Sequence, residues 1–259
     1  MPKRPLTDEN RRFGSPAAPR APRVLDGVLP VDKPSGPTSH DIVDAIRRRF
    51  GIRKAGHGGT LDPQATGLLV ILLGRGTKLS QHFVNSDKRY EGVLRLGIAT
   101  DTHDRDGIVL READFSAVTR ARLEEEMAAR TGDMMQQPPM VSAVKVGGVP
   151  LYRRARKGQT VRREPRLIHV YEFQLHDFDP PLARFSIRCT KGTYVRTLCA
   201  EMGDALGCGA HLAELRRVQT GNLRIENALP FAEILRMNKE ELARRVIPIA
   251  AFAPSSRPG

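Results

Sequence analysis

The sequence predicts an α+β fold, in which helices flank a mixed, largely antiparallel sheet. Some segments alternate apolar and polar residues as strands do, and others carry apolar residues at helical spacing. The two kinds are mixed without the regular β-α-β rhythm that builds a parallel sheet. The chain has 259 residues, of which 40% are hydrophobic, so it can bury a core. These observations exclude a wholly disordered protein.

The charge and the cysteines limit the partners and the compartment. The chain has 42 Lys and Arg residues against 29 Asp and Glu residues, a net charge of +13, which points to nucleic acid or an anionic membrane surface. The longest apolar run extends only from Leu68 to Leu73, far short of the roughly 20 residues that span a membrane. The three cysteines lack ligand spacing, so they predict neither a disulfide framework nor a structural zinc site, and they favour a reducing cytoplasm.

The first elements follow from prolines, caps and glycines. Residues 1–24 hold five prolines and carry a net charge of +4, so they are predicted to be a disordered tail. Residues 27–33 predict a short strand. Thr38 and Ser39 then offer N-caps for a helix that Gly51 ends. The basic residues at the end of this helix form either a solvated helix face or an edge that contacts phosphates.

Two more helices and two strands are predicted further along the chain. The helices lie around Leu123 to Met127 and over residues 195–206, and the strands lie over residues 168–175 and 184–190. A glycine follows each helix, at Gly132 and at Gly207, and is expected to end it.

A basic stretch from Lys145 to Leu167 is predicted to be a mobile loop that closes on a polyanion. It contains eight cations and one acidic residue, a net charge of +7. Pro138 and Pro139 give it a rigid entry, and glycines within it provide hinges. Dense positive charge of this kind neutralises phosphates. A solvated helix face is the alternative interpretation.

The densest group of glycines surrounds Asp62. Residues 56–63 read Gly-His-Gly-Gly-Thr-Leu-Asp-Pro. Pro63 restricts Asp62 to an extended or turn conformation, and the glycines let a ligand approach bare backbone. From these residues alone, Asp62 is either a catalytic carboxylate or a turn residue. The segment lacks the Lys-Ser/Thr ending of a phosphate-binding loop, which argues against nucleotide hydrolysis.

No metal site is predicted. The aspartate-rich residues 101–107 would place Thr102 and Ala113 at the first and twelfth positions of a calcium loop, where carboxylates are needed. The histidines show no paired spacing for zinc.

Arg196 is singled out by its place in a helix. It falls in the first turn of the helix predicted over residues 195–206, where the helix dipole disfavours a cation unless an anion is near. We therefore expect Arg196 to face a carboxylate or a phosphate.

Several short motifs, in their order and spacing, resemble one family. They are Asp32-Lys-Pro34 with Thr38-Ser39, Gly56-His57 with Gly59-Thr-Leu-Asp-Pro63, Ala65-Thr-Gly67, Asp87-Lys-Arg-Tyr90, Thr100-Asp-Thr102, Ser142-Ala-x-Lys145, Lys191-Gly-Thr-Tyr-x-Arg196 and Leu215-Arg-Arg217. Over roughly residues 25–225 the chain is similar to the TruB-type tRNA pseudouridine synthases. The resemblance implies a pseudouridine synthase fold with a central RNA-binding cleft. It also implies isomerisation of uridine 55 in the tRNA T-loop to pseudouridine, without a cofactor or a metal.

The resemblance also implies a site. Asp62 is the expected nucleophile, which attacks either C1′ of the ribose or C6 of the base. The expected substrate-binding residues are His57, Tyr90, Tyr194, Arg196, Leu215 and Lys33. Arg196 would pair with Asp62, keeping it ionised by lowering its pKa by about 1–3 units. Tyr90 would stack on the flipped-out base.

The remaining residues have less specific expected roles. Tyr194 and Leu215 would complete the pocket walls, and His57 would contact the flipped-out nucleotide. Lys33 would make either a phosphate contact or a structural contact.

The expected organisation is a basic tail, a catalytic domain over residues 25–235 and a short C-terminal extension over residues 236–259. Within the domain, the loop 137–158 would grip the T-arm. Many relatives continue into an RNA-binding domain of the PUA type, for which the extension leaves no room. The expected partner is the T-arm stem-loop of tRNA, with no membrane, no metal and no obligate protein partner, and the protein is expected to be a cytoplasmic monomer.

Three other functions fit the sequence less well. The guide-RNA-dependent relatives that modify ribosomal RNA need a C-terminal RNA-binding domain. An RNA-folding chaperone would not need the set of Asp62, Tyr90 and Arg196. A phosphodiesterase or nuclease would need metal ligands that the sequence does not offer.

Overall fold

The computed structural model describes residues 25–252, except 143, 156 and 160. The predicted tail over residues 1–24 therefore lies outside the described residues.

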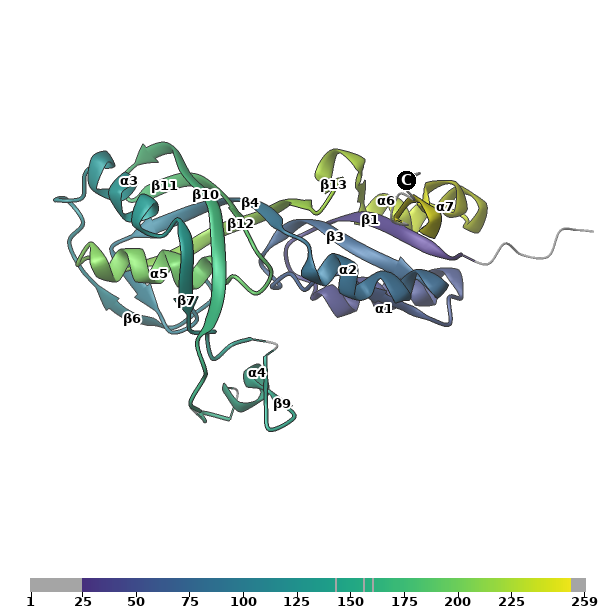
Figure 1. Cartoon of the computed structure of the whole chain (residues 1–259), viewed down its shortest axis with the longest axis horizontal. Helices are drawn as coiled ribbons and strands as arrows, with labels where there is room; N and C mark the ends of the chain where they lie inside the picture. Colours follow the sequence, from purple (N-terminus) through teal and green to yellow (C-terminus); the bar gives the residue numbers. More distant parts are fainter. Residues whose placement is uncertain (1–24, 143, 156, 160, 253–259) are drawn as a thin grey trace, which may run out of the picture.

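Ten strands of the described chain form one sheet that runs through the whole molecule (Figure 1). In spatial order, eight of them are β14 (Leu229–Pro230), β1 (Gly27–Lys33), β3 (Thr66–Leu73), β12 (Ala210–Thr220), β4 (Lys88–Leu96), β11 (Leu182–Cys189), β10 (Arg166–Asp179) and β7 (Gly132–Gln136). Two short strands complete it, β2 (Ala55–His57) on β3 and β13 (Leu223–Arg224) on β12. The pairs β1–β14 and β3–β12 are parallel, and the other pairs are antiparallel. The predicted mixed, largely antiparallel sheet is confirmed.

The helices pack against two halves of the sheet, which have separate hydrophobic cores. They are α1 (Ser39–Phe50), α2 (Ser80–Asn85), α3 (Arg120–Ala129), α4 (Leu151–Ala155), α5 (Val195–Ala205), α6 (Phe231–Arg236), α7 (Lys239–Arg245) and the short 3-10 helices η1 (Gly74–Leu79), η2 (Ile225–Asn227) and η3 (Ile249–Phe252). One core joins α3 and α5 to β4, β10, β11 and β12, and another joins α1, α6 and α7 to β1 and β3. Tyr90 and Leu215 pack against both cores, so they mark the junction between the halves.

Local sequence signals explain where most of the predicted helices begin and end. Thr38 and Asp41 form a capping box at the start of α1, and Gly51 ends it in the left-handed conformation at φ 64°. Gly207 follows α5 as predicted, at φ 79°. The prediction that Gly132 ends α3 was wrong. That helix stops at Ala129, and Gly132 instead opens β7 with φ 98°, because the chain turns sharply there into an edge strand.

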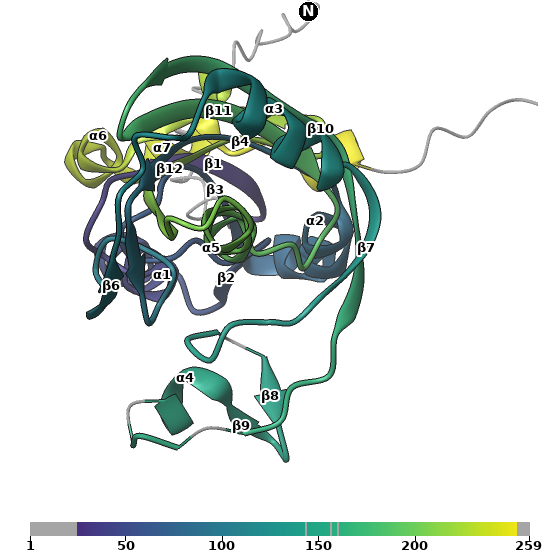
Figure 2. The ribbon, with the colours of Figure 1, turned by 90° about the vertical axis from the view of Figure 1, so that its left-hand side faces the viewer.

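Residues 137–165, here called the insertion, leave the sheet between β7 and β10 and stand apart from it (Figure 2). The predicted gripping loop lies inside this segment. The insertion contains α4 and a hairpin of β8 (Lys145–Val146) and β9 (Val149–Pro150), so it is not wholly irregular. Its two ends are tied together, because Arg163 donates to the carbonyl of Pro138 at 3.0 Å and Gln137 donates to the carbonyl of Arg163 at 3.2 Å.

A second hairpin, of β5 (Ile98–Thr100) and β6 (Val109–Glu112), brings an acidic connection towards α5. In the described ranges, none of the helices combines the length and the apolar character needed to cross a bilayer. Nor do three or more His, Cys, Asp or Glu side chains of the described residues cluster as metal ligands do.

Candidate active site

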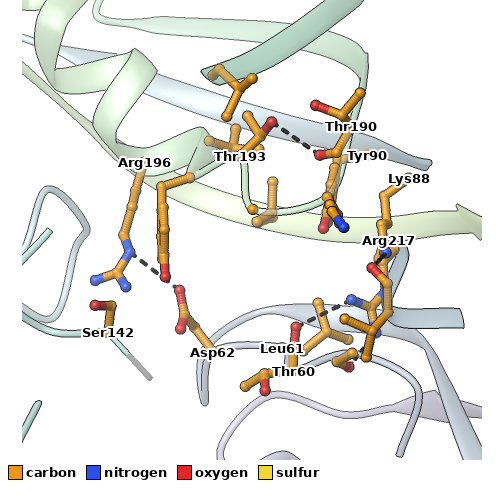
Figure 3. A pocket seen from close by; sticks show the side chains of 18 of the residues that line it. Thr60, Leu61, Asp62, Lys88, Tyr90, Ser142, Thr190, Thr193, Arg196 and Arg217 are labelled. Carbon is orange, nitrogen blue, oxygen red and sulfur yellow. Dashed lines mark hydrogen bonds and ion pairs between the residues drawn. The ribbon is translucent and has the colours of Figure 1, made fainter. Parts of the chain in front are cut away.

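A cleft of about 460 Å³ opens at the junction of the two halves (Figure 3). It brings together five of the seven residues that the sequence predicted for the site. These are Asp62, Tyr90, Tyr194, Arg196 and Leu215. They come from a loop, from β4, from β12 and from the start of α5, so the cleft depends on the whole fold.

Three buried side chains hold the loop that carries Asp62. The hydroxyl of Ser39 donates to the carbonyl of Leu61 at 3.0 Å and accepts from its N–H at 2.9 Å. The ammonium of Lys33 donates to the carbonyls one and three residues after Asp62, both at 2.8 Å. The guanidinium of Arg217 donates to the carbonyls two and three residues before it, at 3.2 and 3.1 Å. Each of the three side chains is at most 2% exposed. Buried hydrogen bonds therefore hold the loop on both sides of Asp62.

Gly67 allows Arg217 to reach this loop. The two residues lie opposite each other where β3 and β12 pair in parallel. Gly67 has φ 95°, and a Cβ atom at that position would lie 2.3 Å from the carbonyl oxygen of Arg217. Only glycine permits so close an approach, which gives the Ala65-Thr-Gly67 motif a structural reason.

Arg196 bridges two carboxylates in the wall of the cleft. Its Nε lies 3.3 Å from Oδ2 of Asp62, and its Nη1 lies 3.7 Å from Oδ2 of Asp104. It also donates to the carbonyl of Thr102 at 3.3 Å and to the carbonyl of Val141. The side chain is 3% exposed, so its charge is balanced within the protein. The anion that the helix position predicted for Arg196 is present.

Opposing effects set the pKa of Asp62. Burial by the cleft walls raises it, the guanidinium of Arg196 lowers it, and the carboxylate of Asp104 raises it again. The net effect is a pKa above the ordinary value of an aspartate. The expected lowering by Arg196 is therefore present but outweighed, because the loss of water destabilises the ionised carboxylate more than the cations of Arg196 and Lys33 stabilise it. The Asp62 side chain is still 39% exposed, so a ligand in the cleft can touch it.

Two hydrogen bonds hold the backbone of Tyr194. It is the N-cap of α5 and makes no side-chain cap bond. Instead, its N–H donates to Oε1 of Gln136 at 2.8 Å, and Nε2 of Gln136 donates to its carbonyl at 3.1 Å. Burial raises the pKa of the Tyr194 phenol, which stays protonated at neutral pH.

Tyr90 and Leu215 belong to the apolar lining of the cleft. Burial also raises the pKa of the Tyr90 phenol, so this ring too is neutral. Lys88 lies close by on the same strand, but its ammonium donates to three carbonyls at the end of α2, at 2.6 to 2.9 Å, and burial lowers its pKa to about 8. An aromatic and an aliphatic side chain beside a carboxylate suit a flat, neutral ring such as a nucleobase.

Two predicted residues do not line the cleft. Lys33 has no exposed surface, and its three hydrogen bonds to carbonyls favour the structural one of its two expected roles over a contact with substrate. His57 lies on β2 opposite Ile71, and burial lowers its pKa. Its contact with a flipped-out nucleotide stays a prediction.

Sequence reasoning missed two residues that support the site. The sequence pattern brought Asp104 to notice only as a position in a possible calcium loop. The signal that could have revealed Asp104 is the buried charge of Arg196. A buried cation needs carboxylate partners, and the partly exposed carboxylate of Asp62 alone would stabilise it only weakly. Gln136 carries no motif of its own, and only the three-dimensional structure shows that it faces Tyr194.

Comparisons with known proteins agree with this geometry. Residues 47–195 match the model of the TruB family pseudouridylate synthase N-terminal domain, and residues 196–252 match that of the tRNA pseudouridylate synthase B C-terminal domain. The chain is 49% identical to the tRNA pseudouridine synthase B of Opitutus terrae, over 90% of this chain and 97% of that protein. It is 43% identical to the enzyme of the same name from Dechloromonas aromatica, over 91% of this chain and 79% of that protein.

Solved structures give the same result at lower identity. The chain is similar to a protein chain in a Cbf5-Nop10-Gar1 complex, with a TM-score of 0.69 and 28% identity, and the similarity covers 87% of the present chain. It spans 60% of the length of that chain. A chain of the archaeal box H/ACA sRNP Nop10-Cbf5 complex has a TM-score of 0.65 and 26% identity. With a family model over more than half of its length and a relative at 49% identity, the chain belongs to the TruB family of pseudouridylate synthases.

Proposed function

We propose that this protein isomerises uridine 55 in the T-loop of tRNA to pseudouridine, with Asp62 as the nucleophile. As a TruB-family pseudouridylate synthase it is an isomerase, and its similar relatives are tRNA pseudouridine synthases. The observation that carries the assignment to Asp62 is its carboxylate. It is the group in the cleft that is at once partly exposed, fixed by buried side chains and adjacent to a guanidinium.

The reaction exchanges one bond to the ribose for another. The Asp62 carboxylate attacks C1′ of the ribose or C6 of the base, and the glycosidic C1′–N1 bond breaks. The uracil turns, C5 bonds to C1′, C5 loses a proton, N1 gains one, and the carboxylate leaves. Nothing is oxidised or reduced, so the chain's own residues are sufficient for the balance of atoms and electrons.

The cleft supplies what a uridine inside a folded loop requires. Such a base must leave its stack, which costs a few kcal/mol. The ring of Tyr90 and the side chain of Leu215 offer an apolar surface that repays part of this cost. Arg196 keeps Asp62 close to its reactive geometry, because a carboxylate held at 3.3 Å by an immobile cation loses little freedom when substrate arrives.

The positive charge needed for RNA lies around the cleft. Arg166 and Lys191 line it and are exposed, and the insertion adds further cations, among them Arg153 and Lys157. We infer that the insertion grips the T-arm from the side opposite the sheet. Action without an obligate protein partner, as a monomer in the cytoplasm, is part of the same proposal.

The similarity to Cbf5 raises guide-dependent modification as a second candidate. The identity to those chains is 25–28%, against 42–49% to the tRNA pseudouridine synthases B. The closer similarity favours tRNA as the substrate.

The experiment is to incubate the protein with an unmodified T-arm stem-loop and map pseudouridine at nucleotide resolution. We expect product at position 55 without any guide RNA or second protein. A matched stem-loop with cytidine at position 55 should give none. Product only at another position, or only after a guide RNA is added, would contradict the proposal.

A further inference from the structure

We propose that Gln136 is a positioning residue for the reaction, whose side chain holds the first turn of α5 so that Tyr194 and Arg196 face Asp62. The inference rests on the proposed function of Asp62 and goes beyond it. Gln136 does not line the cleft. Its influence would pass entirely through the backbone of Tyr194.

One of the two hydrogen bonds of Gln136 satisfies an N–H group at the start of the helix, that of Tyr194. The first N–H groups of an α-helix have no partners within it, and an N-cap side chain normally supplies one. Tyr194 occupies the N-cap but cannot fill this role. The amide of Gln136, only 2% exposed, uses its oxygen and its nitrogen on the backbone of Tyr194. A side chain that makes both bonds to one residue fixes its orientation as well as its position.

The turn that Gln136 holds contains both residues that face the carboxylate. Arg196 comes two residues after the N-cap, and its Nε lies 3.3 Å from Asp62. Rotation of this turn would move the guanidinium and the Tyr194 ring together. Catalysis is sensitive to such shifts, since a misplacement of about 1 Å can cost about 100-fold in rate.

The same stretch of chain also contacts Arg196 directly. Gln136 is the last residue of β7, directly before the insertion, and the carbonyl of Val141 inside the insertion accepts a hydrogen bond from Arg196. This stretch therefore contacts the first turn of α5 at two points, the backbone of Tyr194 and the guanidinium of Arg196. In this way the segment proposed to grip RNA is connected to the proposed nucleophile through Tyr194 and Arg196.

The alternative is that Gln136 only satisfies a buried strand end. The two roles differ in what they do to turnover. A residue needed only for folding lowers the amount or stability of the protein and leaves the kcat of the folded fraction unchanged. A positioning residue lowers kcat and leaves the binding of RNA nearly intact.

The first test is Gln136→Leu, which keeps the approximate volume and removes both hydrogen bonds. The matched control is Gln219→Leu. Gln219 also bonds a backbone carbonyl near a strand end, that of Gly221 at 2.8 Å, but it lies outside the cleft. With the T-arm stem-loop as substrate, we expect kcat of Gln136→Leu to fall about 10- to 100-fold, with KM within about threefold of wild type. We expect Gln219→Leu to stay within about twofold in both.

The second test, Gln136→Glu, keeps the proposal falsifiable if the leucine variant does not fold. An ionised glutamate can still accept from the Tyr194 N–H, but its second oxygen faces the Tyr194 carbonyl without a proton to donate. Burial favours the protonated form of a carboxyl, which restores the donor. Arg166, the cross-strand neighbour of position 136, favours the ionised form, but it is exposed and screened by water. We therefore expect kcat to fall at least tenfold at pH 8, with a loss relative to wild type that shrinks towards pH 6.

The outcomes separate this inference from the function on which it rests. If wild type and Gln219→Leu give no product, the proposed function fails. If both are active, the inference about Gln136 is overturned when a folded Gln136→Leu protein has the same kcat as they do. That holds whether its KM is unchanged or raised. A Gln136→Glu protein that is unfolded across the pH range, or whose loss relative to wild type does not change with pH, overturns it as well.

Discussion

Replacing Arg196 by glutamine should change the pH at which the enzyme becomes active. The guanidinium Nε lies 3.3 Å from the Asp62 carboxylate, and two unit charges at that distance attract each other by about 5 kcal/mol at an effective dielectric constant of about 20. The Asp62 side chain is 39% exposed, so water screens part of this attraction. The appropriate magnitude is therefore the range observed for an aspartate beside an arginine, in which the cation lowers the pKa by about 1–3 units.

Loss of the cation removes that lowering from a pKa that burial already raises. In the Arg196→Gln variant the acid limb of kcat/KM should move upwards by about 1–3 pH units. Where the pH lies below the pKa of Asp62 in both proteins, a pKa higher by about one reduces the ionised fraction of the carboxylate about tenfold. The loss of rate should therefore be larger at pH 6 than at pH 8.5. The measurement is kcat/KM on the T-arm stem-loop between pH 5 and 9.

Asp104 provides the opposite perturbation. Its carboxylate raises the pKa of Asp62, so Asp104→Asn should shift the acid limb downwards. It is also the partner that Arg196→Gln leaves buried and unpaired, with a side chain 6% exposed, at a cost of about 3–5 kcal/mol in the free energy of unfolding. The double variant should recover part of that stability. Profiles for Arg196→Gln and wild type that run parallel at all pH values would refute the reasoning, because Arg196 would then not act on the ionisation of Asp62.

Three further predictions follow from the cleft and its supports. Tyr90→Phe should bind RNA nearly as well as wild type, whereas Tyr90→Leu should lose the stacking of one base, about 1–3 kcal/mol by RNA titration; wild-type affinity and activity of the leucine variant would remove Tyr90 from the site. Lys33→Met should remove three hydrogen bonds to loop carbonyls, leave the buried carbonyl of Ala65 without this donor, and lower the free energy of unfolding in urea by about 3 kcal/mol, and a change below about 1 kcal/mol would contradict its structural role. Replacing Arg153 and Lys157 by alanine should flatten the dependence of log affinity on log salt by up to about 2, at about 0.9 per lost phosphate contact, and an unchanged slope would show that these cations do not touch RNA.

The fold could be predicted where local signals agree with tertiary packing. The cap at Thr38 and the glycine at Gly51 fix the limits of α1 by hydrogen bonds between close neighbours, which the sequence displays directly. Gly132 follows α3 in the sequence but is the first residue of β7. A glycine with positive φ can occur both after a helix and at a turn into a strand. The sequence cannot tell these uses apart without the position of the next strand.

The site could be predicted only as far as motifs mark residues. The proposed nucleophile, the aromatic residue and the arginine lie in such motifs, and the structure brings Asp62, Tyr90 and Arg196 to one cleft. The direction of the Asp62 pKa could not be foreseen, since it depends on how much water the cleft walls exclude. Gln136 was likewise hidden, because its two bonds join residues 58 positions apart.

The most direct test of the central claim is a single-turnover assay of the Asp62→Asn protein on the T-arm stem-loop. Asparagine keeps the size of the side chain and removes the charge that attacks. We predict no detectable pseudouridine, with RNA affinity within about tenfold of wild type, because cations and stacking carry the binding. Pseudouridine formed at an appreciable rate by a well-folded Asp62→Asn protein would contradict the assignment of Asp62 as the nucleophile.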